Sequence, residues 1–263
     1  MLTVEGQCLG AALQVKGWQS YHRAMRLLSG TLLTLGMTLM LARAVLALDA
    51  PAPFTAVYAL SQGAISFGTM ERKFEVDPDG AYRYTSRMEA SGVFSLVRSD
   101  SIVESSRGLL QNGEFRPEHY DYRNSRGNKH YTLRFDYPQA RVLRSDQPKG
   151  WQAAMPPGLK DKLVYQLQMM VDLAAAPEAL RYAVADKNKL KDYRFAVRGE
   201  EKVKTGKGRY RALRLEKGDG PGERRTVVWC ARELGWLPVK VEYHEKDGGV
   251  TTAVLRAFER PKQ

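Results

Sequence analysis

Apolar and polar residues alternate with a period of two along most of this 263-residue chain. Residues 81–90 (AYRYTSRMEA) and 129–137 (KHYTLRFDY) show the pattern clearly. In an extended backbone, successive side chains point to opposite faces, so each segment gathers aromatic and aliphatic side chains on one face and charged side chains on the other. The pattern predicts β-strands with one buried face, and by the same alternation we expect Leu237, Val239, Val241 and Tyr243 to share the core face of one strand.

Short polar segments separate the predicted strands. They are rich in Gly, Asn, Asp and Pro, and they include residues 77–80, 111–114, 126–128, 137–139 and 247–249. These residue types tolerate tight or left-handed turns. Strands joined by such turns are antiparallel neighbours, so the sequence predicts roughly ten to twelve strands in meander order.

The periodicity changes after Pro156-Pro157-Gly158. In residues 159–176 (LKDKLVYQLQMMVDLAAA) the apolar residues recur at spacings of three and four, which predicts an amphipathic helix that ends near Pro177. Residues 178–186 are open to interpretation as a second short helix. Asp161 has two interpretations, a site acid or a carboxylate that stabilises the start of the helix, and the positive end of the helix dipole favours the second.

The predicted fold class is α+β, mostly antiparallel β. We expect a curved meander sheet or half-open barrel wrapped around one main amphipathic helix. The reason is burial: a long sheet with one apolar face cannot leave that face in water, and a single helix is too small to cover a flat sheet. The sheet is therefore expected to curl around the helix.

The N-terminal residues carry the features of an export signal. Arg26 precedes an apolar run to about Leu41, and Val45-Leu46-Ala47 suits signal peptidase. We predict a signal peptide over residues 1–47, cleavage after Ala47, one β-rich exported domain over residues 48–263, and a periplasmic location. Two alternatives stay open: residues 1–24 as an over-extended start before Met25, and an uncleaved membrane anchor, because the apolar run approaches the length that crosses a bilayer.

The formal net charge of +12 bears on partners. In an exported protein, excess positive charge favours anionic lipid head groups or acidic envelope polymers, so we expect no nucleic-acid partner and leave peripheral membrane contact open. The simpler interpretation is a protein with a basic surface, because the charges are spread along strand faces and form no block.

Sequence signatures of catalysis are absent. The chain contains no GxSxG, P-loop, HExxH or CxxC motif. His119, His130 and His244 are scattered over polar strand faces, and Cys230 has no evident basic partner to activate it. The sequence therefore predicts a non-enzymatic protein with no catalytic residues, no cofactor and no metal.

Apolar side chains from the predicted strands and helix are candidates to line a pocket for acyl chains. The candidate ligand-lining residues are Phe67, Phe94, Leu163, Leu167 and Met170. An ordinary packed core is the alternative interpretation of the same residues, and the sequence alone favours it.

Six blocks of sequence in this order carry a family resemblance: residues 54–76, 80–108, 109–122, 159–174, 226–243 and 251–259. Together they resemble a bacterial family of exported proteins catalogued as a domain of unknown function (DUF3108-like). The resemblance covers nearly all of residues 48–263 and rests above all on the helix entry with Asp161 and on the Trp229–Pro238 segment. It implies a periplasmic single domain rich in antiparallel strands, and it gives no catalytic residues to carry over, because the family has none established.

The inferred architecture also resembles the carrier and receptor proteins that ferry lipoproteins across the periplasm, in which a curved sheet wraps around helices to hold acyl chains. Fold alone does not establish function. Two hypotheses follow. The first is a cell-envelope protein that binds a lipid or other apolar ligand inside its curved sheet. The second is an envelope scaffold or interaction protein with a solid core, which engages a protein partner through edge strands or its basic surface.

Overall fold

The computed structural model describes residues 50–91, 101–144, 146, 150–218 and 224–261. These residues all belong to the unit Leu48–Gln263 of the chain. The predictions that concern residues 1–47, namely the signal peptide, its cleavage, the alternative start and the alternative anchor, lie outside the described residues and stay predictions. So does the prediction that Phe94 lines a ligand pocket.

The described residues form one sheet of fifteen strands. The strands are β1 (Phe54–Gln62), β2 (Ile65–Val76), β3 (Ala81–Ala90), β4 (Ser101–Gln111), β5 (Glu114–Asn124), β6 (Lys129–Asp136), β7 (Arg141–Arg144), β8 (Gln152–Ala154), β9 (Lys160–Asp161), β10 (Ala179–Asp186), β11 (Lys189–Lys204), β12 (Arg209–Gly218), β13 (Arg225–Ala231), β14 (Leu237–His244) and β15 (Val250–Glu259). One α-helix, α3 (Tyr165–Asp172), and two 3₁₀ turns, η1 (Leu173–Ala175) and η2 (Arg232–Leu234), complete the described elements.

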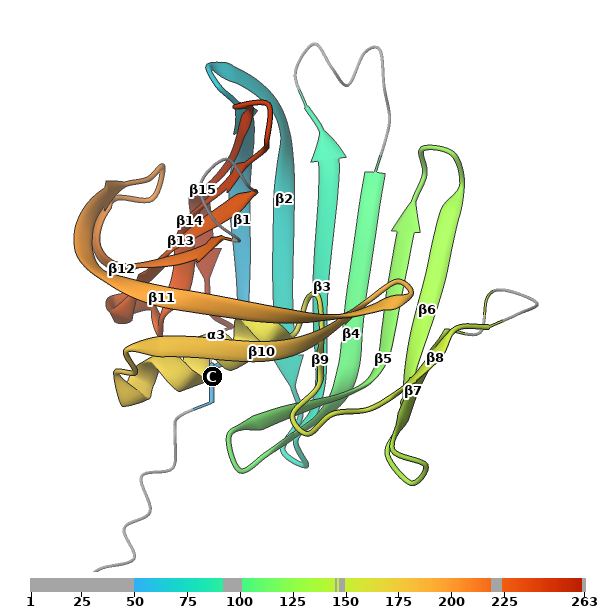
Figure 1. The fold of residues 1–263 in the computed structure, drawn as a ribbon. Coiled ribbons are helices and arrows are strands. Elements are labelled where there is room, and N and C mark those ends of the chain that lie inside the picture. The colour runs from blue at the N-terminus through green and yellow to red at the C-terminus, as the bar shows by residue number, and fades with distance from the viewer. Residues whose placement is uncertain (1–49, 92–100, 145, 147–149, 219–223, 262–263) are drawn as a thin grey trace, which may run out of the picture. The chain divides into compact units, whose positions relative to one another are not determined.

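The sheet consists of two antiparallel meanders, β1–β8 and β10–β15. β1 pairs with β15 and joins the two, with Thr55 opposite Glu259. β9 pairs with β10 in parallel, and the sheet ends at β8 and β9 without closing. Figure 1 shows the sheet curving, with α3 lying across its lower end. The prediction of a mostly antiparallel sheet with one helix is confirmed, and the sheet is open.

The turn between β4 and β5 shows why the meander forms where the sequence predicts it. Asn112 and Gly113 have φ values of 51° and 76°. Two successive left-handed residues make the tight turn that matches the twist of a hairpin, and Asn and Gly are the residues that adopt it at least cost.

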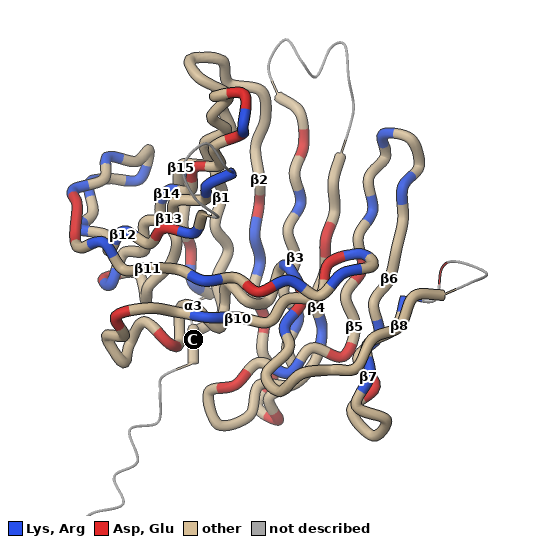
Figure 2. The backbone as a smooth tube through the Cα atoms, in the orientation of Figure 1, with Lys and Arg blue, Asp and Glu red and all other residues tan. Residues whose placement is uncertain are grey.

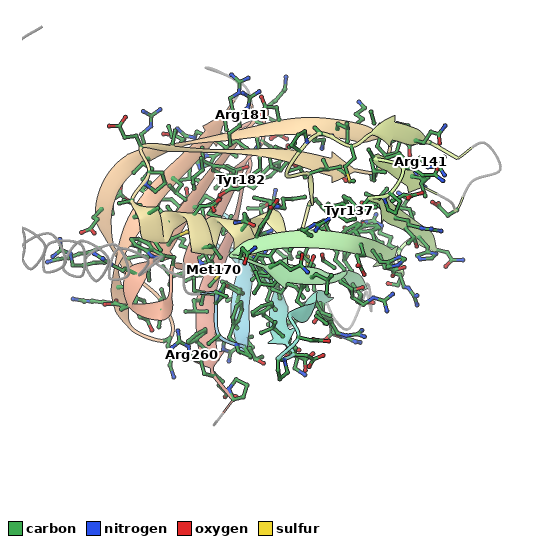
Figure 3. All side chains as sticks on the ribbon, turned by 90° about the horizontal axis from the view of Figure 1, so that it is seen from below. Tyr137, Arg141, Met170, Arg181, Tyr182 and Arg260 are labelled. Carbon is green, nitrogen blue, oxygen red and sulfur yellow. The ribbon has the colours of Figure 1, made fainter. Side chains whose placement is uncertain are left out.

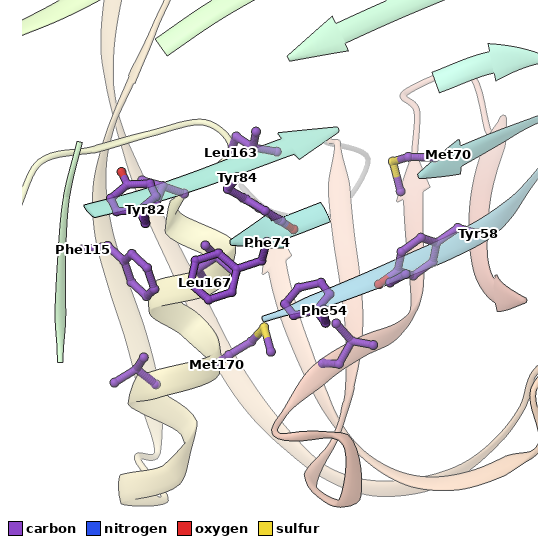
Figure 4. Close-up of a cluster of buried hydrophobic side chains, with 14 of the residues drawn as sticks. Phe54, Tyr58, Met70, Phe74, Tyr82, Tyr84, Phe115, Leu163, Leu167 and Met170 are labelled. Atoms are coloured by element: carbon purple, nitrogen blue, oxygen red, sulfur yellow. The ribbon is translucent and has the colours of Figure 1, made fainter. Parts of the chain in front are cut away.

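The helix α3 is buried around its circumference. All five residues from Leu167 to Val171 are buried, and five residues exceed one full helical turn. On one side Leu163, Leu167 and Met170 join the aromatic side chains of β1–β5, as Figure 4 shows. On the other side Met169 and Leu173 join a second cluster with β10–β13.

Residues 178–186 do not form the second short helix considered from the sequence. Ala179–Asp186 is strand β10, and Tyr182 lies opposite Tyr193 of β11. Leu180, Tyr182 and Val184 are buried at every second position. This period of two is the strand pattern, and pairing with β11 overrides the local helix propensity of the alanines.

The expectation that Leu237, Val239, Val241 and Tyr243 share one face is wrong beyond Val239. Trp229 pairs with Lys240 and Cys230 with Pro238, so Val239 is the extra residue of a β-bulge. A bulge changes which face the following residues occupy. Accordingly, Leu237 and Val239 belong to the first cluster, whereas Val241 packs against the second.

Candidate functional site

A pocket of about 500 Å³ lies between the C-terminal end of α3, the turn η2, the start of β1 and the end of β15. We call it the Trp236 pocket. Its lining includes the apolar residues Phe54, Met170, Ala174, Leu234, Trp236 and Phe258, the segment of residues 50–52 that precedes β1, and the basic residues Arg232 and Arg260. Figure 3 views the molecule from below and labels Met170 on α3 and Arg260 just after β15. The pocket therefore combines aromatic and aliphatic walls with two guanidinium groups.

The turn that carries Trp236 has an unusual backbone. Gly235 and Trp236 both have positive φ values, 71° and 63°. The turn is held by two hydrogen bonds, from the Gly235 N–H to the Arg232 carbonyl and from the Trp236 N–H to the Ala231 carbonyl, each 2.9 Å. A bulky side chain at positive φ is a strained outlier. Such strain concentrates at ligand sites, where the surrounding structure fixes a side chain in a particular place.

The two arginines of the pocket lie against its aromatic walls. The guanidinium carbon of Arg232 is 5.6 Å from the ring centroid of Trp236, and that of Arg260 is 5.6 Å from the ring centroid of Phe258. Arg260 also borders the turn, since a Cβ added to Gly235 would lie 3.4 Å from its Nη2 atom. These cation–π contacts orient both side chains while leaving them exposed to solvent.

The residues predicted from the sequence to line a ligand pocket have different positions. Met170 lines the Trp236 pocket. Leu163 and Leu167 are buried in the first core cluster, and Phe67 is half-buried and packs against that cluster. The sequence did not identify Arg232, Trp236 or Arg260 as pocket residues. Arg232 and Trp236 lie in the Trp229–Pro238 segment that carries the family resemblance, but the segment does not show which side chains surround a pocket.

Asp161 stabilises the entry to α3. Its Oδ1 accepts hydrogen bonds from the N–H groups of Leu163 and Val164, each 2.8 Å, and its Oδ2 accepts one from the Ser106 hydroxyl at 2.5 Å. The carboxyl is fully buried. Burial raises the pKa of Asp161 to about 6, opposed by these three hydrogen bonds. Asp161 belongs to strand β9 and not to the first turn of α3, which begins at Tyr165, so the expected place at the end of the helix dipole is wrong. Asp161 instead stabilises the segment that leads into the helix, through these hydrogen bonds.

This carboxyl predicts a specific pH dependence. The pKa of Asp161 is raised from 3.8 to about 6, so the folded state favours the protonated form, and the stability contributed by this group is lost as the pH rises from about 4 to above 6. Two pH units correspond to about 3 kcal/mol. Asp161→Asn keeps an oxygen for the two N–H groups and cannot ionise. In urea melts at pH 4.5 and pH 7.5 we expect the variant to gain stability relative to the wild type at the higher pH.

The difference in free energy of unfolding between wild type and Asp161→Asn reports on this group alone. Asp121, Asp146 and Asp186 have lowered pKa values and therefore add stability as the pH rises, but they do so equally in both proteins. A constant difference between wild type and variant over this pH range would contradict the assignment.

Other polar side chains fix α3 to the sheet. Arg72 of β2 is buried, donates to the Oε1 of Gln166 on α3, and lies 5.5 Å from the ring centroid of Tyr58. Its Nε has no hydrogen-bond partner in the part of the chain that the structure describes. Lys162 pairs with Glu104 at 2.6 Å, and Glu104 accepts from the Tyr120 hydroxyl at 2.5 Å. Gln166 thus connects α3 to β2, and Lys162, just before the helix, connects the helix entry to β4.

The remaining candidates for chemistry have structural positions. Cys230 is fully buried, and burial raises the pKa of its thiol. His119 and His130 are exposed, and His244 is half-buried beside Glu242 at 3.0 Å. Within the described ranges, no three His, Cys, Asp or Glu side chains are arranged to hold a metal ion. No helix in this described portion is long and apolar enough to cross a membrane.

A family model described as a protein of unknown function (DUF3108) matches residues 56–255. No curated protein matches the chain. Among solved structures, the chain is similar to a β-barrel-like protein of the domain of unknown function DUF1849 from Brucella abortus, with 10% identity, a TM-score of 0.53, and coverage of 80% of this chain and 98% of that one. This likeness shows a common fold.

Two further structures are less similar. MucB has 13% identity and a TM-score of 0.34 over 81% of this chain and 55% of its own. A domain from Vibrio parahaemolyticus, provisionally named for outer-membrane lipoprotein sorting, has 12% identity and a TM-score of 0.30 over 81% and 87% of the two chains. At these scores neither structure adds to the assignment of the fold.

Proposed function

The chain belongs to the DUF3108 family of proteins of unknown function, and from this premise we propose that it is a non-enzymatic cell-envelope protein that holds a lipid or another apolar ligand in the Trp236 pocket. The observation that carries the proposal is the pocket itself. Its volume of about 500 Å³ falls in the range of small-molecule sites, roughly 300–1,000 Å³.

The lining of the pocket favours a hydrocarbon chain. Phe54, Met170, Trp236 and Phe258 present apolar surface from four separate elements. Burying a methylene group contributes about 0.8 kcal/mol. A chain that buries about eight methylenes would gain about 6 kcal/mol before the cost of association is subtracted. The proposed site lies at the C-terminal end of α3, whereas the sequence-based hypothesis placed the ligand inside the curved sheet.

The proposed location is the periplasm. Its support is the export signal predicted in residues 26–47 and the resemblance to exported proteins. Figure 2 shows Lys and Arg interspersed with Asp and Glu along the strands. A mixed surface of this kind is compatible with peripheral membrane contact, and we propose no nucleic-acid partner.

The second candidate is a scaffold or interaction protein of the envelope. One observation favours it: the space between α3 and the sheet is filled by packed side chains, among them Leu163, Leu167 and Phe115, each at most 1% exposed. In this case the Trp236 pocket would be a surface depression without a ligand, and the partner would be another envelope protein.

Ala174→Trp separates the two candidates. Ala174 is exposed and lines the pocket, so an indole there fills the pocket without disturbing the core. Ala175→Trp is the matched control, because Ala175 is exposed on the same 3₁₀ turn and is not part of the lining. We expect the wild type and Ala175→Trp to bind dansyl-labelled undecanoic acid and to co-purify with lipid in native mass spectrometry. Ala174→Trp is expected to bind the probe at least about tenfold more weakly, a loss of about 1.4 kcal/mol.

A wild-type protein with a clean apo mass and no affinity for the probe would reject the ligand hypothesis and favour the scaffold.

A further inference from the structure

Arg232 and Arg260 are the two basic residues of the Trp236 pocket, and the lining that the structure describes contains no acidic side chain. Neither forms an ion pair with a described acid, whereas Arg144 pairs with Asp146 at 2.7 Å and Arg225 with Glu216 at 3.0 Å. Both unpaired arginines line the same pocket. Two cations at one apolar pocket, without a carboxylate to balance them, leave an excess of positive charge there.

The geometry leaves their hydrogen-bond donors available. Each guanidinium lies against one aromatic ring of the pocket wall, at 5.6 Å from the centroid. Both side chains are exposed to solvent, so their N–H groups are accessible to a ligand. These N–H groups match a carboxylate or phosphate, which accept paired hydrogen bonds from arginine.

We propose that the ligand is a single-chain anionic amphiphile, whose carboxylate or phosphate monoester binds Arg232 and Arg260 while its hydrocarbon chain contacts Met170, Trp236 and Phe258. This inference rests on the proposed function, because it assigns a head group to the ligand of the same pocket. Trp236, whose φ of 63° is a strained value for a bulky residue, lines the same pocket as the two arginines, and strain of this kind is typical of ligand sites.

The test compares ligands that share one chain and differ in head group. Decanoate, decyl phosphate and decanol displace dansyl-labelled undecanoic acid in a fluorescence titration, and inorganic phosphate alone is a fourth arm. We expect decanoate and decyl phosphate to bind the wild type at least about tenfold more tightly than decanol, because charge-assisted hydrogen bonds are the strong ones. Inorganic phosphate, which has no chain, is expected not to displace the probe at equal concentration.

The variant Arg232→Gln/Arg260→Gln should remove this preference, so that decanoate and decyl phosphate bind no more tightly than decanol. Arg256→Gln is the control, because Arg256 is an exposed arginine of β15, the strand that Arg260 follows, and is not part of the pocket lining. Arg256→Gln should keep the tenfold preference.

The possible failures are distinguishable. Equal affinities for decanoate and decanol, with Ala174→Trp still blocking both, would overturn the anionic head group and leave the proposed function standing. Displacement by inorganic phosphate as effective as that by decyl phosphate would also overturn the proposal, in favour of a simple anion site. Absence of binding by every ten-carbon ligand would overturn the inference and the proposed function together.

Discussion

Val239→Asp is expected to lower the free energy of unfolding by several kcal/mol, on the order of the whole stability of a marginal domain. Val239 is completely buried at the bulge of β14 and belongs to the first core cluster. A carboxylate there would lose its water, and the nearest base along the strand, Lys240, already pairs with Glu242 at 2.7 Å. The variant would either bury a charge or take up a proton, and both are costly.

Urea melts measure the effect, and Lys240→Met is the control. Methionine keeps a long apolar side chain over the ring of Trp229, from which the Lys240 ammonium lies 4.5 Å. Losing that partly exposed cation should cost less than about 1 kcal/mol. Lys240→Asp is a poorer control, because it would place an acid beside Glu242. Equal midpoints for Val239→Asp and the wild type would mean that this segment does not form part of the core.

Asp161→Ala has the second largest expected effect, a loss of about 2–4 kcal/mol. The methyl group leaves the buried N–H groups of Leu163 and Val164 and the hydroxyl of Ser106 without the acceptor that they now share. Each unsatisfied buried group costs about 1–3 kcal/mol. Part of this loss is offset at neutral pH, because the alanine variant no longer has to bury an ionised carboxylate.

Asp161→Asn is the matched control for this substitution. Its side-chain oxygen still accepts from the two N–H groups, and its amide N–H₂ replaces the oxygen that Ser106 now donates to. Ser106 can then accept from this amide and donate to Tyr82 instead, because the two hydroxyls lie 3.1 Å apart and either can be the donor. In chemical denaturation at pH 7.5, alanine should destabilise the protein and asparagine should not. If both variants melted together below the wild type, the negative charge and not the hydrogen-bond acceptor would be the essential feature of Asp161.

The sequence predicts the sheet well where local pattern and tertiary pairing agree. In β3, Tyr82 and Tyr84 are buried as the alternation requires, and Asn112-Gly113 forms the tight turn that its composition predicts. The helical spacing of the apolar residues predicts the helix, but the helix begins only at Tyr165, and Lys160–Asp161 form strand β9 instead. The buried circumference of the helix depends on strands that are distant in sequence, so a local stripe does not show it.

The sequence-based predictions fail where a β-bulge moves the following side chains to the other face of a strand. They also fail where pairing with a distant strand determines whether a segment forms a helix or a strand. The bulge at Val239 depends on the opposing strand β13, and β10 is a strand because β11 pairs with it. The pocket was the least predictable feature. The sequence identifies Met170 as a candidate pocket residue. It does not predict the positive φ of Trp236, and it therefore does not predict that Trp236 lines the same pocket.

The central claim, that the Trp236 pocket holds a hydrocarbon chain, is tested most directly by photo-crosslinking the full chain with a diazirine-bearing fatty acid and mapping the labelled peptides by mass spectrometry. We expect the label on the segments that contain Met170 and Trp236, which both line the pocket, and we expect its loss in Ala174→Trp but not in Ala175→Trp. Label confined to strands β4–β7, or label at Met170 and Trp236 that Ala174→Trp leaves unchanged, would contradict the account.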